Sequence, residues 1–142
     1  MLITFPVPIA IIDDDVVQTK LISGFLKDFP NITMQVFNDP LVAMKEIEEG
    51  KFKIVITDLK MEGLKGDDLV RRCTELRQGM QMIVVTGTDH LMSAIRCFNA
   101  GARRIIRKPI NKQELVDALN LCVDHFLAFN ATVKSITAKK AS

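Results

Sequence analysis

Short apolar runs and longer amphipathic stretches alternate five times along the chain. Apolar runs of strand length occupy residues 9–12, 33–37, 54–57, 82–85 and 103–107. Helical spacing of apolar side chains, or helix-start and helix-stop residues, predicts helices over residues 16–29, 40–49, 67–76 and 91–99 and from 112 onward. Because parallel strands need a covering crossover helix, this order predicts an α/β fold with one parallel sheet and helices on both of its faces.

The last predicted helix carries a long apolar stripe, whose members follow one another in alternating steps of four and three residues, as in a coiled coil. The stripe consists of Leu115, Leu119, Cys122, Phe126, Phe129, Val133 and Ile136. A helix over residues 112–136 would be about 37 Å long and would overhang a strand of about 17 Å. Residues after Asn130 are poor helix formers, however, so the sequence equally allows a helix that ends there.

Size and composition fit one folded domain. The chain has 142 residues, of which 48% are hydrophobic and 25% charged, and its net charge is +2. We predict a domain over residues 1–130, with residues 131–142 forming either an extension of the last helix or a flexible tail. We expect methionines, including Met80, Met82 and Met92, to fill the core.

Net charge, hydropathy and cysteine spacing limit the partners and the compartment that the sequence suggests. A nearly balanced charge gives no argument for binding nucleic acid, and no apolar run approaches the roughly 18 residues of a membrane span. The three cysteines are widely spaced and suit buried thiols in a reducing compartment. We therefore expect a cytoplasmic protein that contacts neither a membrane nor nucleic acid directly.

Polar side chains follow four of the five predicted strands: Asp13 and Asp14 the first, Asp58 the third, Thr86 the fourth and Lys108 the fifth. The carboxyl ends of parallel strands meet at one edge of a sheet, so these side chains should converge. Clustered carboxylates suit Mg²⁺, while a lysine and a threonine hydroxyl add a positive charge and a donor for phosphoryl oxygens. Asp58 could then accept a phosphoryl group as an aspartyl phosphate. Each residue alone is an ordinary strand end, and only their coincidence predicts a site.

Taken in order, these motifs resemble the receiver domain of two-component response regulators, the chemotaxis-regulator-like family. The resemblance rests on residues 11–15, 54–66, 84–87 and 101–110. It implies a flavodoxin-like (βα)5 doubly wound sandwich whose five-stranded parallel sheet has the order 2-1-3-4-5. It also implies a cis peptide bond between Lys108 and Pro109.

The resemblance implies a role for each site residue. Asp58 would take a phosphoryl group from a histidine kinase or phosphotransfer protein in an Mg²⁺-dependent reaction. The Mg²⁺ ligands would be Asp13, Asp14, Asp58 and the backbone carbonyl of Lys60. Lys108 would pair with phosphoryl oxygens and Thr86 would hydrogen-bond one of them. The chain would be a phosphorylation-controlled switch, and not an enzyme that acts on a separate substrate.

Three positions depart from the family pattern or leave its tuning open. Ile105 stands where the family has a switch aromatic, so switching would depend on backbone and aliphatic repacking. Lys60 and Thr88 occupy the positions through which the family tunes dephosphorylation, so the lifetime of the phosphate is left open.

Partners and rival functions follow from the same residues. A downstream output domain or protein is implied, and a homodimer could form through the last helix or the basic face of strand five, at Arg103, Arg104 and Arg107. A hydrolase of the haloacid dehalogenase type would need an acid where Lys60 stands. A flavodoxin-like cofactor binder would need a phosphate-binding loop where residues 13–15 are acidic.

Overall fold

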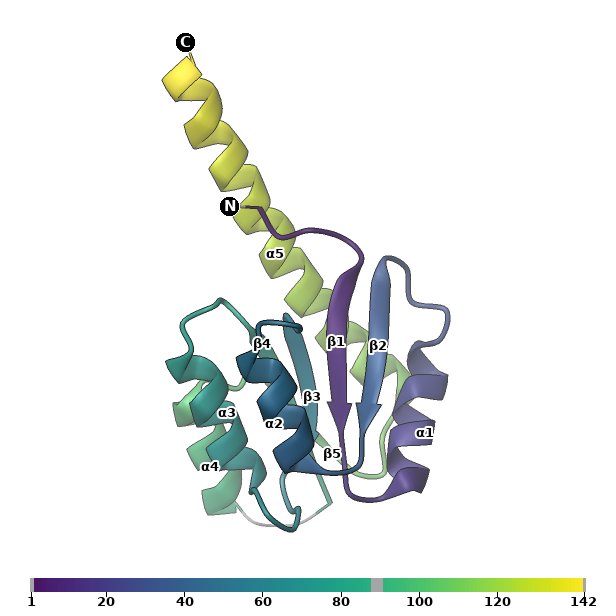
Figure 1. Ribbon diagram of the computed structural model, residues 1–142. Helices are drawn as coiled ribbons and strands as arrows, with labels where there is room; N and C mark the ends of the chain where they lie inside the picture. Colours follow the sequence, from purple (N-terminus) through teal and green to yellow (C-terminus); the bar gives the residue numbers. More distant parts are fainter. Residues whose placement is uncertain (1, 88–90, 142) are drawn as a thin grey trace.

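The computed structural model describes residues 2–87 and 91–141, in which strands and helices alternate along the chain (Figure 1). The strands are β1 (Val7–Ile12), β2 (Ile32–Phe37), β3 (Ile54–Asp58), β4 (Gln81–Thr86) and β5 (Arg104–Arg107). The helices are α1 (Val16–Leu26), α2 (Pro40–Glu48), α3 (Gly66–Glu75), α4 (Leu91–Ala100) and α5 (Lys112–Ala141). Neighbouring strands are parallel in the order β2-β1-β3-β4-β5, so the predicted fold class and strand order are confirmed.

Helices cover both faces of the sheet, and each face has its own hydrophobic core (Figure 1). On one face, α2, α3 and α4 contribute Met44, Leu69 and Cys97 to the core. On the other face, α1 and α5 contribute Ile22 and Leu119. Every residue of the central strand β3 is buried, which explains why its sequence is almost continuously apolar up to its final residues.

Helix α1 ends at Leu26, three residues earlier than predicted. Pro30 has no N–H to donate to the carbonyl of Leu26, and proline disfavours helical geometry in the preceding residue, Phe29. Val17 and Leu21, which we assigned to the apolar face, are exposed. The residues of α1 that are buried are Thr19, Ile22 and Leu26.

The outer side of α4 carries a patch of exposed apolar side chains. Its members are Leu91, Met92, Ile95 and Phe98. The prediction that Met92 fills the core is therefore wrong, whereas Met80 and Met82 are buried as expected. Cys97 is the buried residue of α4. Met92 lies five positions before it, which places Met92 about 140° around the helix axis from Cys97 and away from the core.

Helix α5 is continuous over 30 residues, a length of about 45 Å, and its far end projects beyond the sheet (Figure 1). The alternative of a helix that ends near Asn130 is therefore wrong, although the domain boundary at residue 130 stays a prediction. The stripe is buried as far as Phe126, whereas Phe129 and Ile136 are 45% and 54% exposed. No helix in the described ranges combines the length and apolar character needed to cross a membrane.

Asn130 ties the N-terminal segment to α5. Its side-chain Oδ1 accepts a hydrogen bond from the backbone N–H of Ile3 at 2.8 Å, and its Nδ2 donates to the carbonyl of Ile3 at 2.9 Å. Asn130 is nearly buried. This tertiary contact overrides the low local helix propensity that made the sequence ambiguous here.

Replacing Asn130 with alanine is expected to lower the free energy of unfolding by about 1–2 kcal/mol, because both backbone groups of Ile3 lose their partner. Urea denaturation of the whole chain measures the change. Asn120→Ala, at an exposed position on the same helix, is the matched control and should leave the free energy of unfolding within about 0.5 kcal/mol. Equal losses in the two variants would contradict a specific role for the Asn130 contact.

Candidate functional site

Three carboxylates meet at the C-terminal edge of the sheet. Asp13 and Asp14 follow β1, and Asp58 is the last residue of β3. A carboxylate oxygen from each lies within 4.8 Å of the others. Asp13 and Asp58 are only 1% and 8% exposed, whereas Asp14 is open to solvent. The predicted convergence of these strand ends is confirmed.

Lys108 brings a positive charge to the two buried carboxylates. Its Nζ lies 3.3 Å from Oδ2 of Asp13 and 3.4 Å from Oδ1 of Asp58. The backbone N–H of Lys108 donates to the carbonyl of Thr86 at 2.7 Å, which joins the ends of β4 and β5. A Cβ at Gly87 would lie 3.3 Å from Cδ of Lys108, so the missing side chain lets the lysine stem pass close to the backbone. The predicted cis peptide bond before Pro109 is confirmed.

Backbone and side-chain hydrogen bonds hold the first acidic segment. The backbone N–H of Asp13 donates to the carbonyl of Phe37 at 3.1 Å and so continues the hydrogen bonding between β1 and β2 by one residue. Asn38, which the sequence analysis did not assign to the site, donates from Nδ2 to the carbonyl of Asp13 at 2.8 Å. Asp15 accepts from the N–H of Val17 at 2.9 Å and so caps α1. The third acid of the triplet therefore stabilises a helix start, and the other two form the cluster.

Gly66 supports the segment that carries Asp58. The sequence predicted that helix α3 begins at residue 67, but Gly66 is already the first residue of α3, and its N–H donates to the carbonyl of Leu59 at 2.9 Å. A Cβ there would lie 2.4 Å from the carbonyl oxygen of Asp58 and 2.7 Å from Cα of Leu59. This close backbone contact fixes the distance between the start of α3 and the end of β3. Gly63 and Gly66 in the sequence are typical of a tight turn, but they do not indicate that backbone atoms of Asp58 and Leu59 lie against Gly66.

Burial raises the pKa of Asp13 above its ordinary value of 3.8, against the hydrogen bond from the N–H of Asp15 and with added repulsion from Asp58. Burial also raises the pKa of Asp58, although the charge of Lys108 and a hydrogen bond from the N–H of Leu59 act in the opposite direction. Both carboxylates are thus more costly to ionise in the folded chain than in the unfolded chain. A cation bound between the carboxylates would lower this cost.

These raised pKa values predict the pH dependence of stability in the metal-free chain. The stability that the raised pKa values of Asp13 and Asp58 add to the free energy of unfolding is fully present below pH 3.8. It is lost as pH rises through the higher folded-state pKa values. Asp13→Asn removes one of the two titrating groups, so it should gain stability relative to the parent chain as pH rises. Urea titrations in EDTA between pH 4 and 8 measure the difference in free energy of unfolding between Asp13→Asn and the parent chain. Asp28→Asn, at an exposed position, is the control. A difference that does not change with pH would contradict the assignment.

The remaining predicted site residues lie around the cluster. Thr86 is the last residue of β4 and is buried, one position beyond Val85, which pairs with Asp58. Ile105 is partly buried and packs against the core beneath α2, α3 and α4. Thr88 lies outside the residues that the structure describes.

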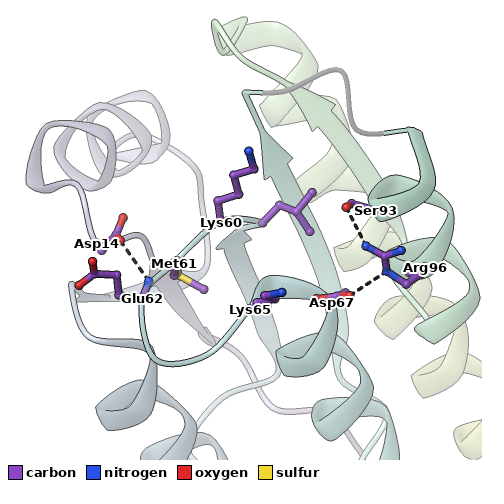
Figure 2. A pocket seen from close by; sticks show the side chains of 9 residues that line it. Asp14, Lys60, Met61, Glu62, Lys65, Asp67, Ser93 and Arg96 are labelled. Atoms are coloured by element: carbon purple, nitrogen blue, oxygen red, sulfur yellow. Dashed lines mark hydrogen bonds and ion pairs between the residues drawn. The ribbon is translucent and has the colours of Figure 1, made fainter.

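A pocket of about 500 Å³ opens beside the cluster, and Asp14 and Lys60 both line it (Figure 2). The N–H of Glu62 donates to Oδ2 of Asp14 at 3.4 Å at one side of the pocket. At the other side, Arg96 on α4 pairs with Asp67 on α3 at 3.2 Å (Figure 2). The open side of the carboxylate cluster therefore faces a cleft whose lining carries both positive and negative side chains.

The sequence profile of the response regulator receiver domain matches residues 9–120, which is most of the chain. The chain belongs to this family. Chemotaxis protein CheY-3 of Vibrio cholerae is 27% identical over 114 residues, covering 79% of this receiver domain and 88% of the relative. A CheY-like response regulator receiver domain from Methanospirillum hungatei JF-1, known from its crystal structure, has a TM-score of 0.79 and 27% identity, and the match covers 86% and 97% of the two chains.

Other relatives are longer than this receiver domain. Transcriptional regulatory protein FixJ of Rhizobium meliloti is 30% identical over 80 residues, which is 56% of this chain and 39% of the relative. Response regulator protein TodT of Pseudomonas putida is 24% identical over 111 residues, which is 78% of this chain and 48% of the relative. The matched part of these regulators is thus less than half of their length.

Receiver domains are phosphoacceptor switches of two-component signalling. This function replaces the two alternatives raised by the sequence, a phosphohydrolase and a flavodoxin-like cofactor binder. The carboxylate cluster of Asp13, Asp14 and Asp58 has the composition that a receiver domain uses to hold a divalent cation.

Proposed function

We propose that Asp58 is the residue that carries the phosphoryl group in this receiver domain. The observation that supports this assignment most directly is its surroundings: Oδ1 of Asp58 lies 3.4 Å from Nζ of Lys108, and carboxylates of Asp13 and Asp14 lie beside it. Asp58 also ends the central strand β3, so its side chain is held by a buried element.

The residues present fit an Mg²⁺ ion. We propose that carboxylate oxygens of Asp13, Asp14 and Asp58 hold it, together with the backbone carbonyl of Lys60. Hard oxygen ligands from carboxylates, a carbonyl and water are the set that Mg²⁺ prefers, and two of these carboxylates are buried with raised pKa values. When bound, the ion offsets negative charge on the carboxylates and on the incoming phosphoryl oxygens.

The chain's own side chains then position and stabilise the transferred group. The donor is a phosphohistidine of a sensor kinase or phosphotransfer protein. Its phosphorus–nitrogen bond breaks as a carboxylate oxygen of Asp58 bonds to phosphorus, and the electron pair leaves with the imidazole. Lys108 shifts its ion pair from the free carboxylate to a phosphoryl oxygen, and the hydroxyl of Thr86 donates to another. Movement of Thr86 toward the phosphoryl group would carry the change to the β4–α4 surface.

Intact mass after incubation with acetyl phosphate and Mg²⁺ tests the assignment. The whole chain should gain one phosphoryl group, Asp58→Ala should gain none, and EDTA should abolish the gain. Asp28→Ala, an exposed aspartate away from the cluster, should be labelled like the parent chain. Labelling of Asp58→Ala, or no labelling of either chain, would overturn the assignment of the acceptor.

We further propose that the receiver works in a reducing compartment, with the cytoplasm as the expected place. Its cysteines are Cys73, Cys97 and Cys122, and all three are free and buried. Burial raises their pKa values to about 12, 11 and 12 respectively, so the reactive thiolate form is disfavoured. Thiols of this kind pack as small apolar groups, as the sequence analysis expected.

We also propose that a second copy of the chain binds along the projecting end of α5. Val133 and Ile136 continue the four-and-three spacing of the stripe beyond the sheet, where Ile136 is 54% exposed. Such a seam is typical of paired helices. An output domain or partner protein would then contact a pair of receiver domains held together by α5.

Sedimentation equilibrium should therefore show a dimer that dissociates when Val133 and Ile136 are both replaced by lysine, because two charges would enter the seam. The matched control adds the same charge at two exposed polar positions, Thr132→Lys with Ser135→Lys, and should stay dimeric. A parent chain that is monomeric at high concentration would contradict the proposal. Dissociation by Arg104→Glu alone would place the interface on the strand-five face instead.

A further inference from the structure

A second cavity lies at the end of the sheet opposite the carboxylates. It has a volume of about 620 Å³ and lies between the N-terminal segment, the residues that precede β3 and β4, and α5. The length of a strand, about 17–20 Å, separates it from the carboxylate cluster. Cavities of this size are typical of sites for small molecules.

One wall of the cavity is apolar and anchored. Leu2 and Ile3 line it from the N-terminal segment, and Phe126 and Phe129 line it from α5. Leu2 and Phe129 are 39% and 45% exposed, so they offer apolar surface that the fold does not cover. The two hydrogen bonds between Asn130 and the backbone of Ile3 hold the segment in place. The wall is therefore formed in the free chain.

The other wall is basic. Lys53 and Arg77 line the cavity together with His125, and none of the described residues that line it is acidic. Lys53 donates from Nζ to the carbonyl of Gln78 at 3.2 Å, which fixes its position. Neither Lys53 nor Arg77 has a carboxylate within 4.0 Å in the described part of the chain, where the ion pairs involve other residues. Two cations thus face the cavity with their charge uncompensated.

Arg77 occupies a backbone conformation that favours glycine. Its φ is +53°, in the left-handed region, where a side chain costs conformational free energy. Its N–H donates to the carbonyl of Thr74 at 3.1 Å, as expected just past the end of α3. The backbone therefore favours glycine over arginine at position 77, and replacing Arg77 with glycine should not strain the fold.

We propose that this cavity binds a small amphipathic anion, an apolar chain or ring system that ends in a carboxylate. The apolar body lies along Phe126, Phe129 and Leu2, and the carboxylate faces Lys53 and Arg77. Charge complementarity selects the anion, and the exposed apolar surface of Leu2 and Phe129 selects the apolar body. The site does not depend on phosphorylation of Asp58.

Calorimetric titration of the whole chain tests the proposal with three probes. Decanoate should bind with one site per chain. Acetate, which lacks the apolar body, and decyltrimethylammonium, which carries the opposite charge on the same chain, should not bind. Equal affinity for decanoate and decyltrimethylammonium would overturn the role of the basic wall, and absence of decanoate binding would overturn the site.

Variants of the cavity separate binding from folding. Lys53→Gln keeps a donor for Gln78, and Arg77→Gly suits the positive φ, so each should weaken decanoate binding about tenfold without lowering the melting temperature. Phe98→Ser, on the exposed apolar patch of α4, and Leu121→Ser, at an exposed position of α5 outside the cavity, are the controls and should bind as the parent does. Loss of binding in either control, with Lys53→Gln unaffected, would place the ligand on another surface and overturn the proposal.

Discussion

Replacing Gly66 with alanine is expected to destabilise the chain by about 3 kcal/mol and to displace the segment that carries Asp58. A Cβ at this position would lie 2.4 Å from the carbonyl oxygen of Asp58 and 2.7 Å from Cα of Leu59. Both neighbours are backbone atoms of a buried strand end, so neither can rotate away as a side chain could. Relief of the clash requires α3 to move away from β3.

Urea denaturation and labelling by acetyl phosphate measure the two consequences of Gly66→Ala. The matched control is Gly24→Ala, at a position in the last turn of α1 where a Cβ meets no atom within 4 Å. That variant should gain about 0.5–1 kcal/mol, because alanine is the better helix former. A Gly66→Ala chain as stable as the parent, with unchanged labelling, would mean that the β3–α3 junction adapts without cost.

Replacing Lys108 with methionine should slow phosphoryl transfer to Asp58 by about 100-fold. The ammonium group lies 3.4 Å from Oδ1 of Asp58 and 3.3 Å from Oδ2 of Asp13, where it can follow negative charge as the phosphoryl group arrives. Methionine keeps the length and apolar stem of the side chain but removes the charge. The pKa of Asp58 should rise further, since Lys108 is the strongest influence that lowers it.

Labelling rates at saturating Mg²⁺ measure the effect of Lys108→Met, with Lys112→Met as control. Lys112 is exposed at the start of α5, so its replacement removes the same charge at a position outside the cluster. We expect the control to be labelled at the parent rate. A parent-like rate in Lys108→Met would assign charge stabilisation to other groups.

Sequence patterns predicted the parts of the structure that depend on strand order and strand ends. Parallel strands place Asp13, Asp58 and Lys108 at one edge whatever the details of packing, so the position of each along its strand was enough to predict their convergence. A separate local rule predicted that α2 begins at Pro40, and in the structure the Asp39 side chain caps this helix by accepting from the N–H of Leu41. These features follow from local rules applied in the right order.

Features that depend on contacts between distant segments could not be predicted. Asn130 is unfavourable in a helix by local propensity, and its hydrogen bonds to Ile3, 127 residues earlier, are a tertiary contact that stabilises α5 at this position. The close approach of Gly66 to Asp58 depends on how α3 leaves the sheet. Met92 was misplaced because its apolar character says nothing about which side of α4 faces the core.

The contact between Asn130 and Ile3 also decides how the molecule responds to mechanical force. If residue 2 and the end of α5 are pulled apart, the shortest load path runs from Ile3 through the side chain of Asn130 and along the helix. The sheet lies outside this path and stays unloaded until the two hydrogen bonds rupture. A tether attached at these two ends would therefore report the release of the N-terminal segment as a first, separate event before the strands come under tension.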